Sequence, residues 1–243
     1  MQCGGEYSAS SGHFTSPGYP VGYEDNLNCQ YKIMPPRPMD FVTIDFEEPF
    51  QLEAGKFTVL KKFTQKVISQ LVFLGNACNF DSVKVIESQT HTQKAKVCGV
   101  EKPSSVLSRG ETLVQFKSDR SITAQGFHIR YTIQPCGGVI TEDFAEIKSP
   151  THLNGYMHNL NCTWTIQAPA GQVVELKFNS LEMEIHSRCN YDYVAAFHGD
   201  SISANDEIGR YCGNQTTVPP VLKSRSNIMT VQFKTDRSIS AGG

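Results

Sequence analysis

The sequence SPGYPVGYEDNLNC, residues 16–29, has a close counterpart in SPTHLNGYMHNLNC, residues 149–162. Both stretches contain turn-forming Pro, Gly or Asn residues and end on the same NLNC tetrapeptide. The match continues on either side, where CGGEYS answers CGGVIT, CNFDSVKV answers CNYDYVAA, VCGVEKP answers YCGNQTTVP, and LVQFKSDRSITAQG answers MTVQFKTDRSISAGG. One structural unit therefore occurs twice, with a boundary near Gln134-Pro135.

The length and charge of the chain limit its class. The 243 residues suffice for two domains that each bury a core. The net charge of −2, with both signs spread along the chain, indicates no nucleic-acid partner. No apolar run reaches the ~18 residues of a spanning helix, so we expect no direct membrane insertion of this stretch. Met1-Gln2 leads straight into a cysteine, which we interpret as a piece of a longer chain.

Cysteine is the strongest compositional signal. A zinc site needs two close pairs, whereas the closest cysteines here, Cys78 and Cys98, lie 20 positions apart. A disulfide framework and an extracellular or cell-surface location are therefore favoured, and four cysteines in each half leave three possible pairings per half. Sequons at Asn161 and Asn214 agree with secretion as N-glycosylation sites. The eight cysteines are Cys3, Cys29, Cys78, Cys98, Cys136, Cys162, Cys189 and Cys212.

Within each half the dominant hydrophobic period is two. In FVTIDF, Val42, Ile44 and Phe46 alternate with the other residues, and GFHIRYTI repeats the pattern at residues 126–133. His128 alternates outward in that second segment and is interpreted as a solvated surface residue. Short alternating strands broken by Gly, Pro and Asn turns predict antiparallel sheets packed as a sandwich.

The series C-G-G, S-P-x-Y-P, Y-x2-N-x2-C, C-x-Y/F-D, C-G and F-x-S/T-D-x-S resembles the CUB domain, a jelly-roll β-sandwich of extracellular proteins. The resemblance implies an all-β chain of two consecutive CUB-type jelly-roll β-sandwiches, residues 3–133 and 136–243. Because Gly243 aligns with Gly126, we expect the second module to be truncated, to lack its last strand, and to be poorly stable with an unpaired edge. The family pattern implies the disulfides Cys3–Cys29, Cys78–Cys98, Cys136–Cys162 and Cys189–Cys212.

The resemblance also implies calcium sites. In the second module Glu184, Asp192 and Asp236 match the family's ligand pattern, and the backbone carbonyl of Ser238 and water would complete the shell. Calcium takes six to eight hard oxygen ligands, and three carboxylates from separate loops repel one another unless a cation lies between them. The alternative is three unrelated, solvated acids.

The first module offers the same ligands at a different spacing. Asp81, Asp119 and Ser121 match their counterparts, and Glu53 aligns with the glutamate of the second module. Glu53 lies 25 positions before Cys78, however, against five positions in the second module, which is an excess of 20 residues. We assign this excess to an anomalous insertion at residues 56–75.

Two interpretations of the insertion remain. The first is a basic amphipathic helix for a membrane surface or a partner groove. The second, which we favour, is a translated intron: residues 55–57 can be encoded with the donor GTAAGT, and residues 73–75 with the acceptor TTTCTAG. Removing 20 codons would restore the spacing as Glu-Ala-Gly-Asn-Ala-Cys. The helical pattern comprises Phe57, Leu60, Val67, Ile68, Leu71 and Leu74.

The function implied by the resemblance is that of calcium-dependent modules binding extracellular proteins, in a fragment of a cubilin-like multi-CUB endocytic receptor. The implied partners are protein ligands presenting Lys or Arg, and further CUB modules of the parent chain. An alternative is a non-catalytic exosite region of a secreted tolloid-like metalloprotease or CUB serine protease, and a third is a structural spacer. No HExxH or GxSxG motif occurs, so we expect no catalytic activity.

Overall fold

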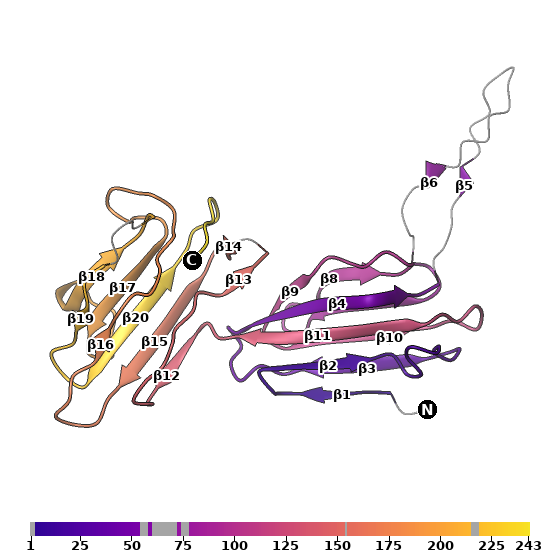
Figure 1. Ribbon diagram of the computed structural model, residues 1–243, viewed down its shortest axis with the longest axis horizontal. Helices are drawn as coiled ribbons and strands as arrows, with labels where there is room; N and C mark the ends of the chain where they lie inside the picture. Colours follow the sequence, from indigo (N-terminus) through magenta and orange to yellow (C-terminus); the bar gives the residue numbers. More distant parts are fainter. Residues whose placement is uncertain (1–2, 54–57, 60–71, 74–77, 154, 215–218) are drawn as a thin grey trace, which may run out of the picture. The chain divides into compact units, whose positions relative to one another are not determined.

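A computed structural model describes residues 3–53, 58–59, 72–73, 78–153, 155–214 and 219–243 (Figure 1). The chain divides into two compact units, one comprising residues 1–38 and 42–133 and the other residues 39–41 and 134–243. The described residues form β-strands and a single short 3-10 turn, which confirms the predicted all-β class. No helix among them is long and apolar enough to cross a membrane.

The first unit is a sandwich of two sheets. Its strands are β1 (Gly4–Tyr7), β2 (Ser11–Thr15), β3 (Asn28–Ile33), β4 (Phe41–Gln51), β7 (Ser82–Glu87), β8 (Thr92–Val97), β9 (Val106–Arg109), β10 (Thr112–Lys117) and β11 (Gly126–Gln134). One sheet has the order β1-β3-β10-β7-β8 and the other the order β2-β11-β4-β9 (Figure 1). Strand β11 is therefore an internal strand, flanked by β2 and β4.

The alternation read from the sequence decides which side chains enter the core of this sandwich. Val42, Ile44 and Phe46 of β4 are at most 1% exposed, and Phe127 and Ile129 of β11 are fully buried. The residues between them face outward and are polar. The period of two thus places one face of each strand against the opposite sheet.

The C-G-G motif has a steric cause. Gly4 has φ of +101°, and a Cβ there would lie 2.1 Å from the carbonyl oxygen of Gln30 on the parallel neighbour β3. Gly137, φ +104°, has the same relation to Thr163 O at 2.4 Å. Only glycine fits both the conformation and the approach of the two backbones.

The second unit repeats the five-stranded layer. Its elements are β12 (Gly137–Ile140), β13 (Thr151–His152), β14 (Gly155–Tyr156), β15 (Asn161–Gln167), β16 (Glu175–Leu176), β17 (Tyr193–His198), the 3-10 turn η1 (Ala204–Asp206), β18 (Glu207–Tyr211), β19 (Leu222–Lys223) and β20 (Ile228–Lys234). The large sheet has the order β12-β15-β20-β17-β18, and two-stranded sheets β13-β14 and β16-β19 form the rest (Figure 1).

The sequence predicts that the second unit lacks its last strand, the counterpart of β11. In the described part of residues 136–243, no strand takes the place that β11 has in the first unit. Within this range, the N–H of Glu182 donates to the carbonyl oxygen of Gly243 at 3.0 Å, and the N–H of Gly243 donates to the carbonyl oxygen of Glu182 at 2.7 Å. Since β11 has a neighbour on each side, its counterpart would be an internal strand, and the unpaired edge that we expected from its absence stays a prediction. The poor stability of this module stays a prediction.

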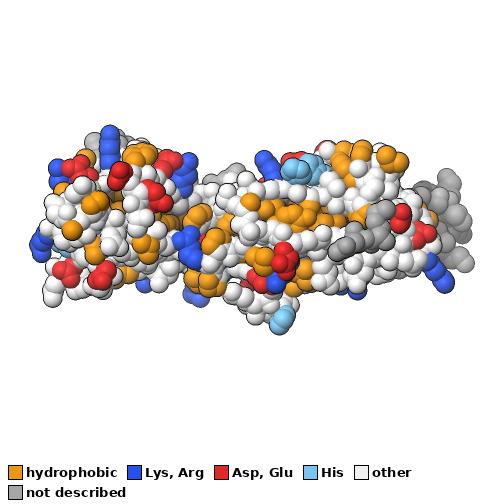
Figure 2. All heavy atoms as spheres, turned by 90° about the horizontal axis from the view of Figure 1, so that it is seen from below, with side chains coloured by type: hydrophobic (Ala, Val, Ile, Leu, Met, Phe, Trp, Pro, Cys, Tyr) orange, Lys and Arg blue, Asp and Glu red, His pale blue; other side chains and the backbone are white. Residues whose placement is uncertain are grey.

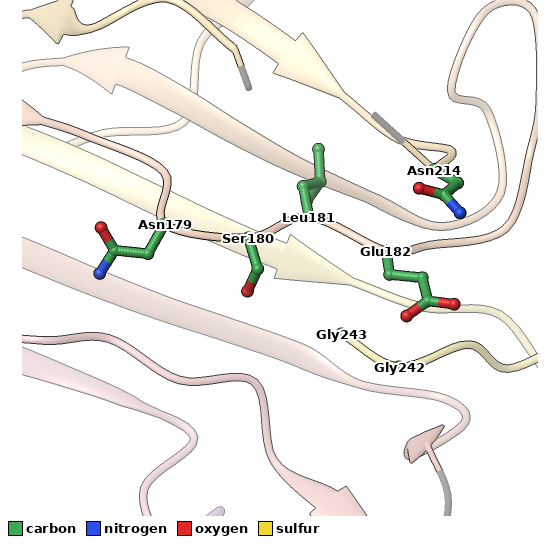
Figure 3. Close-up of a pocket in the computed structure, with 7 residues that line it drawn as sticks. All are labelled: Asn179, Ser180, Leu181, Glu182, Asn214, Gly242 and Gly243. Carbon is green, nitrogen blue, oxygen red and sulfur yellow. The ribbon is translucent and has the colours of Figure 1, made fainter. Parts of the chain in front are cut away.

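A shallow pocket lies beside that backbone pairing. Figure 3 shows Leu181 pointing away from Ser180 and Glu182, as in an extended strand. The pocket is lined by Asn179, Ser180, Leu181, Glu182, Asn214, Gly242 and Gly243.

The insertion at residues 56–75 falls largely outside the described residues. Within it, β5 (Thr58–Val59) pairs antiparallel with β6 (Val72–Phe73). All six positions of the predicted amphipathic helix lie outside the described residues. Of the residues that would encode the splice signals, only Phe73 is described. Both interpretations of the insertion stay predictions.

Four disulfides join the cysteines in sequential pairs. They are Cys3–Cys29, Cys78–Cys98, Cys136–Cys162 and Cys189–Cys212, and the described residues contain no free cysteine. These are the pairs that the family resemblance implies.

Candidate metal centre

Each unit brings three carboxylates together from separate loops. One oxygen from each side chain lies within 4.8 Å of an oxygen from the other two. The first triad comprises Glu53, Asp81 and Asp119, and the second Glu184, Asp192 and Asp236. All six residues were singled out from the sequence as calcium ligands.

Strand pairing accounts for the first triad. Asp81 immediately precedes β7, Asp119 follows β10 by two residues, and the register of these antiparallel neighbours pairs Ser82 with Lys117. The backbone N–H of Asp119 donates to Asp81 Oδ1 at 2.8 Å. Glu53 follows the end of β4 by two residues and completes the cluster. The cluster forms although residues 54–77, which include the insertion, lie between Glu53 and Cys78.

A tyrosine holds the buried member of each triad. Tyr23 donates its hydroxyl proton to Asp81 Oδ2, and the Tyr23 oxygen accepts from the backbone N–H of Glu53 at 3.2 Å. Asp81 is fully buried, and both of its carboxylate oxygens are hydrogen-bonded. The sequence prediction did not assign this role to Tyr23. The signal was present in Y-x2-N-x2-C, which begins with this tyrosine in both halves.

The second triad repeats these contacts. Tyr156 donates to Asp192 Oδ2 at 2.6 Å and accepts from the backbone N–H of Glu184 at 3.0 Å. The N–H of Asp236 donates to Asp192 Oδ1 at 2.7 Å. The two centres therefore share their hydrogen-bond pattern as well as their acids.

The asparagine of the same motif shapes the adjoining loop. Asn26 and Asn159 adopt left-handed φ angles of 58° and 55°, which asparagine tolerates better than most residues. Their N–H groups donate to the carbonyl oxygens of Asp119 and Asp236 at 2.6 and 2.7 Å. Each asparagine thus ties the loop before the second cysteine of the first disulfide to the loop that carries the third acid.

The predicted serines contact the third acid of each triad. The N–H of Ser121 donates to Asp119 Oδ1 at 2.7 Å, and its hydroxyl lies 3.1 Å from the same oxygen. Ser238 makes the same contacts with Asp236, at 2.7 and 3.0 Å. The serines therefore orient the carboxylates, and their expected carbonyl contacts to an ion stay a prediction.

The electrostatics of both triads favour a cation. Glu53 Oε2 and Glu184 Oε2 are buried and have no hydrogen-bond partner among the described residues. Burial, followed by the charges of Asp119 and Asp81, raises the pKa of Glu53. Burial and the two neighbouring aspartates likewise raise the pKa of Glu184. Buried acceptors are normally paired, so an orphaned oxygen in each cluster fits a cation ligand.

Asp81 and Asp236 have pKa values that are shifted in opposite directions. Burial raises the pKa of Asp81 more than the hydrogen bonds from Tyr23 and from the N–H of Asp119 lower it. In the second triad, hydrogen bonds from Ser238 lower the pKa of Asp236. The second triad thus sets Glu184, whose pKa is raised by burial and repulsion, beside Asp236, whose pKa is lowered by hydrogen bonds.

The two sequons lie at exposed positions. Asn161 begins β15, and its Oδ1 accepts from Gln232 Nε2 at 2.8 Å. Asn214 borders the pocket of Figure 3, and Thr216 of its sequon lies outside the described residues. Glycosylation at both positions stays a prediction.

On the face shown in Figure 2, acidic and basic side chains are interspersed.

Tandem disulfide-bonded β-sandwiches, each with an acidic triad beside its second disulfide, define a class of binding module. The CUB domain family model matches residues 3–131 and 136–243, and the chain belongs to this family. CUB domains are generally non-catalytic binding modules.

Matches to two relatives that cover this chain almost completely support the assignment. Cubilin of Sus scrofa is 33% identical over 245 residues, which cover 100% of this chain and 6% of that protein. Procollagen C-endopeptidase enhancer 2 of Homo sapiens is 31% identical over 252 residues, 99% of this chain and 55% of that protein. Among solved structures, the CUB1-EGF-CUB2 domains of rat MASP-1 match with a TM-score of 0.40 and 22% identity, covering 99% of this chain and 97% of that one. The chain thus spans only a small part of cubilin.

Proposed function

We propose that the two modules are calcium-dependent binding modules for extracellular proteins, belonging to a multi-CUB receptor of the cubilin type. The observation that carries the proposal is the duplicated triad, in which Glu53 Oε2 and Glu184 Oε2 are buried without a partner. Calcium would be held by the three carboxylates of each triad and would remove the repulsion between them. The disulfides agree with an oxidising compartment outside the cell.

The charge balance of a loaded site indicates the chemistry of the partner. Three carboxylates around a divalent ion leave a net charge of about −1, held by oxygens that the tyrosine and serine contacts keep in place. A Lys or Arg side chain of an extracellular protein would form charge-assisted hydrogen bonds to such a rim. One such contact is weak, and two modules on one chain gain affinity by engaging two basic side chains at once.

The relatives support the receptor form of the proposal by their similarity over the whole chain. In such a receptor, calcium dissociation constants in the range of extracellular modules, about 10⁻⁴ to 10⁻³ M, would allow the protein ligand to be captured outside the cell. Endocytosis would then release the ligand where free calcium and pH are low.

A calcium titration of the full chain, followed by partner binding, tests the proposal. We expect two calcium ions per chain, and none for a variant carrying Asp81→Asn and Asp192→Asn. A lysine-bearing protein partner should bind in calcium, and binding should disappear in chelator or after acetylation of the partner's lysines. Calcium uptake by the double variant, or partner binding that persists in chelator, would refute the proposal.

A further inference from the structure

A second group of metal-binding side chains lies on the outer face of the sheet β2-β11-β4-β9. His13 on β2 and His128 on β11 occupy neighbouring strands, and the register pairs His13 with Arg130 and His128 with Thr15. The two histidines are therefore diagonal neighbours on one face. Their ring centroids lie 5.4 Å apart, with the planes at 85°.

A carboxylate fixes the orientation of one of the rings. Glu47 on β4 has its Oε2 2.9 Å from His128 Nδ1, so this nitrogen donates to the carboxylate. The lone pair of the neutral ring then lies on Nε2. His128 Nε2 is buried and has no hydrogen-bond partner among the described residues. His128 is thus not the freely solvated residue that its sequence position indicated.

We propose that His13 and His128 bind a divalent transition-metal ion such as Zn²⁺, with His128 Nε2 as one ligand and an imidazole nitrogen of His13 as the other. A metal-ligating histidine characteristically donates its second N–H to a carboxylate, and Glu47 occupies that place. Two imidazoles bound at ~2.0–2.1 Å with a tetrahedral angle hold their ring centres about 5 Å apart. The observed ring-centre distance of 5.4 Å is close to this value.

The surrounding charges favour a cation. Arg130 Nη2 lies 3.7 Å from Asp45 Oδ2, and Arg130 Nε lies 3.6 Å from Glu47 Oε1, so two carboxylates face one guanidinium. Together these three side chains carry a net charge of −1, beside two histidines that are neutral when they bind metal. The Tyr19 ring, 6.1 Å from the His128 ring, provides a further neighbour without charge. Waters, or a ligand from a bound protein, would fill the remaining positions.

This site differs from the calcium triads in place and chemistry. Glu47 precedes Glu53 by six residues, about 20 Å along an extended strand. Imidazole suits zinc and copper, whereas calcium takes oxygen ligands, so millimolar Ca²⁺ should not occupy the histidine pair. The position equivalent to His13 in the second module is Glu146, so we expect one such site per chain.

Calorimetric titration of the full chain with Zn²⁺ in millimolar Ca²⁺ tests the proposal. We expect one Zn²⁺ per chain, lost in both His13→Ala and His128→Ala. Glu47→Gln should weaken zinc binding by about 10–100-fold, the usual effect of removing a carboxylate partner of a ligating histidine. The matched control is His91→Asn, which replaces an exposed histidine in a left-handed turn, φ 53°, that asparagine tolerates. Its zinc binding should equal that of the wild type.

Cooperative thermal unfolding of each variant shows that it is folded before its titration is compared. Binding that is unchanged in both histidine variants would place the zinc elsewhere and overturn the proposal. The absence of zinc binding to the wild type would also overturn it, because the rings would then make only an edge-to-face contact. Neither result bears on calcium at the triads, so the two proposals fail separately.

Discussion

The Tyr23 hydroxyl donates a hydrogen bond to Asp81, a residue 58 positions further along the chain. Tyr156 makes the same contact with Asp192 across only 36 positions. The contact is therefore kept while the length of the intervening chain changes. It links the segment before the second cysteine of the first disulfide to the loop that follows the first cysteine of the second disulfide. It also presents the buried aspartate to the other two acids.

Replacing either tyrosine with phenylalanine should destabilise its unit and weaken calcium binding. In Tyr156→Phe, Asp192 Oδ2 loses its donor and the N–H of Glu184 loses its acceptor. Leaving buried polar groups unsatisfied costs about 1–3 kcal/mol of unfolding free energy. Urea unfolding and a calcium titration measure the two effects. Tyr191→Phe, which removes a hydroxyl from a half-exposed ring, is the control and should change neither quantity.

Neutralising the unpaired glutamates should have opposite effects with and without calcium. In chelator, Glu53→Gln and Glu184→Gln each remove one of three mutually repelling charges and should raise the unfolding midpoint. In calcium, each variant should bind the ion about tenfold more weakly or worse, since a unit charge ~4 Å from a divalent ion is worth ~2 kcal/mol even in water. A shift of the midpoint in the same direction under both conditions would contradict the cation site.

The pH dependence follows from the raised pKa values of the same glutamates. Their folded pKa exceeds the unfolded value of about 4.3. Their contribution to stability is therefore complete below the unfolded pKa and is lost as pH rises through the folded pKa. In chelator, the stability of the wild type relative to a Glu53→Gln, Glu184→Gln double variant should fall as pH rises across this window. Calcium should reverse the trend, because the ion competes with protons for the carboxylates. Urea midpoints at a series of pH values measure both curves.

The architecture was predictable because it follows from a local hydrophobic alternation and from motifs that occur in both halves. Period-two alternation in residues such as Val42 and Ile44 specifies which face of a strand is buried, and duplicated cysteines and acids identify the unit. The six triad residues were found because they match the ligand pattern that the CUB resemblance implies, and the same acids recur around the second cysteine pair of each half. Aligning the two halves of the chain with each other thus supported what the family resemblance implied.

What escaped prediction depends on contacts between distant segments. The role of Tyr23 requires knowing that its hydroxyl reaches Asp81, and the partner of His128 lies on another strand. The internal place of β11 depends on strand order, which alternation does not encode. Period two placed His128 on the outer face correctly, but it could not show that Glu47 and the His13 ring would cover it.

The left-handed asparagines offer a test of the loop geometry. Asn26→Gly should leave stability within a few tenths of a kcal/mol, because glycine accepts φ of 58° without strain. Asn26→Val should cost about 1–3 kcal/mol, since a β-branched residue is strained at that angle. It should also weaken calcium binding, because the Asn26 N–H holds the loop of Asp119. Urea unfolding of both variants distinguishes a backbone requirement from a loss of the asparagine side chain.

Deleting residues 56–75 should leave the first calcium site intact. The deletion joins Gly55 to Asn76 and sets Glu53 five positions before the cysteine, the spacing that the second module uses to form the same triad. Because Glu53 already lies with Asp81 and Asp119 when the segment is present, both forms should bind two calcium ions with similar affinity. Calorimetric titration of the two forms measures this, and sequencing of the transcript across the junction decides whether the segment belongs to the mature protein. Loss of one calcium ion on deletion would show that the segment supports the site and would contradict its interpretation as a translated intron.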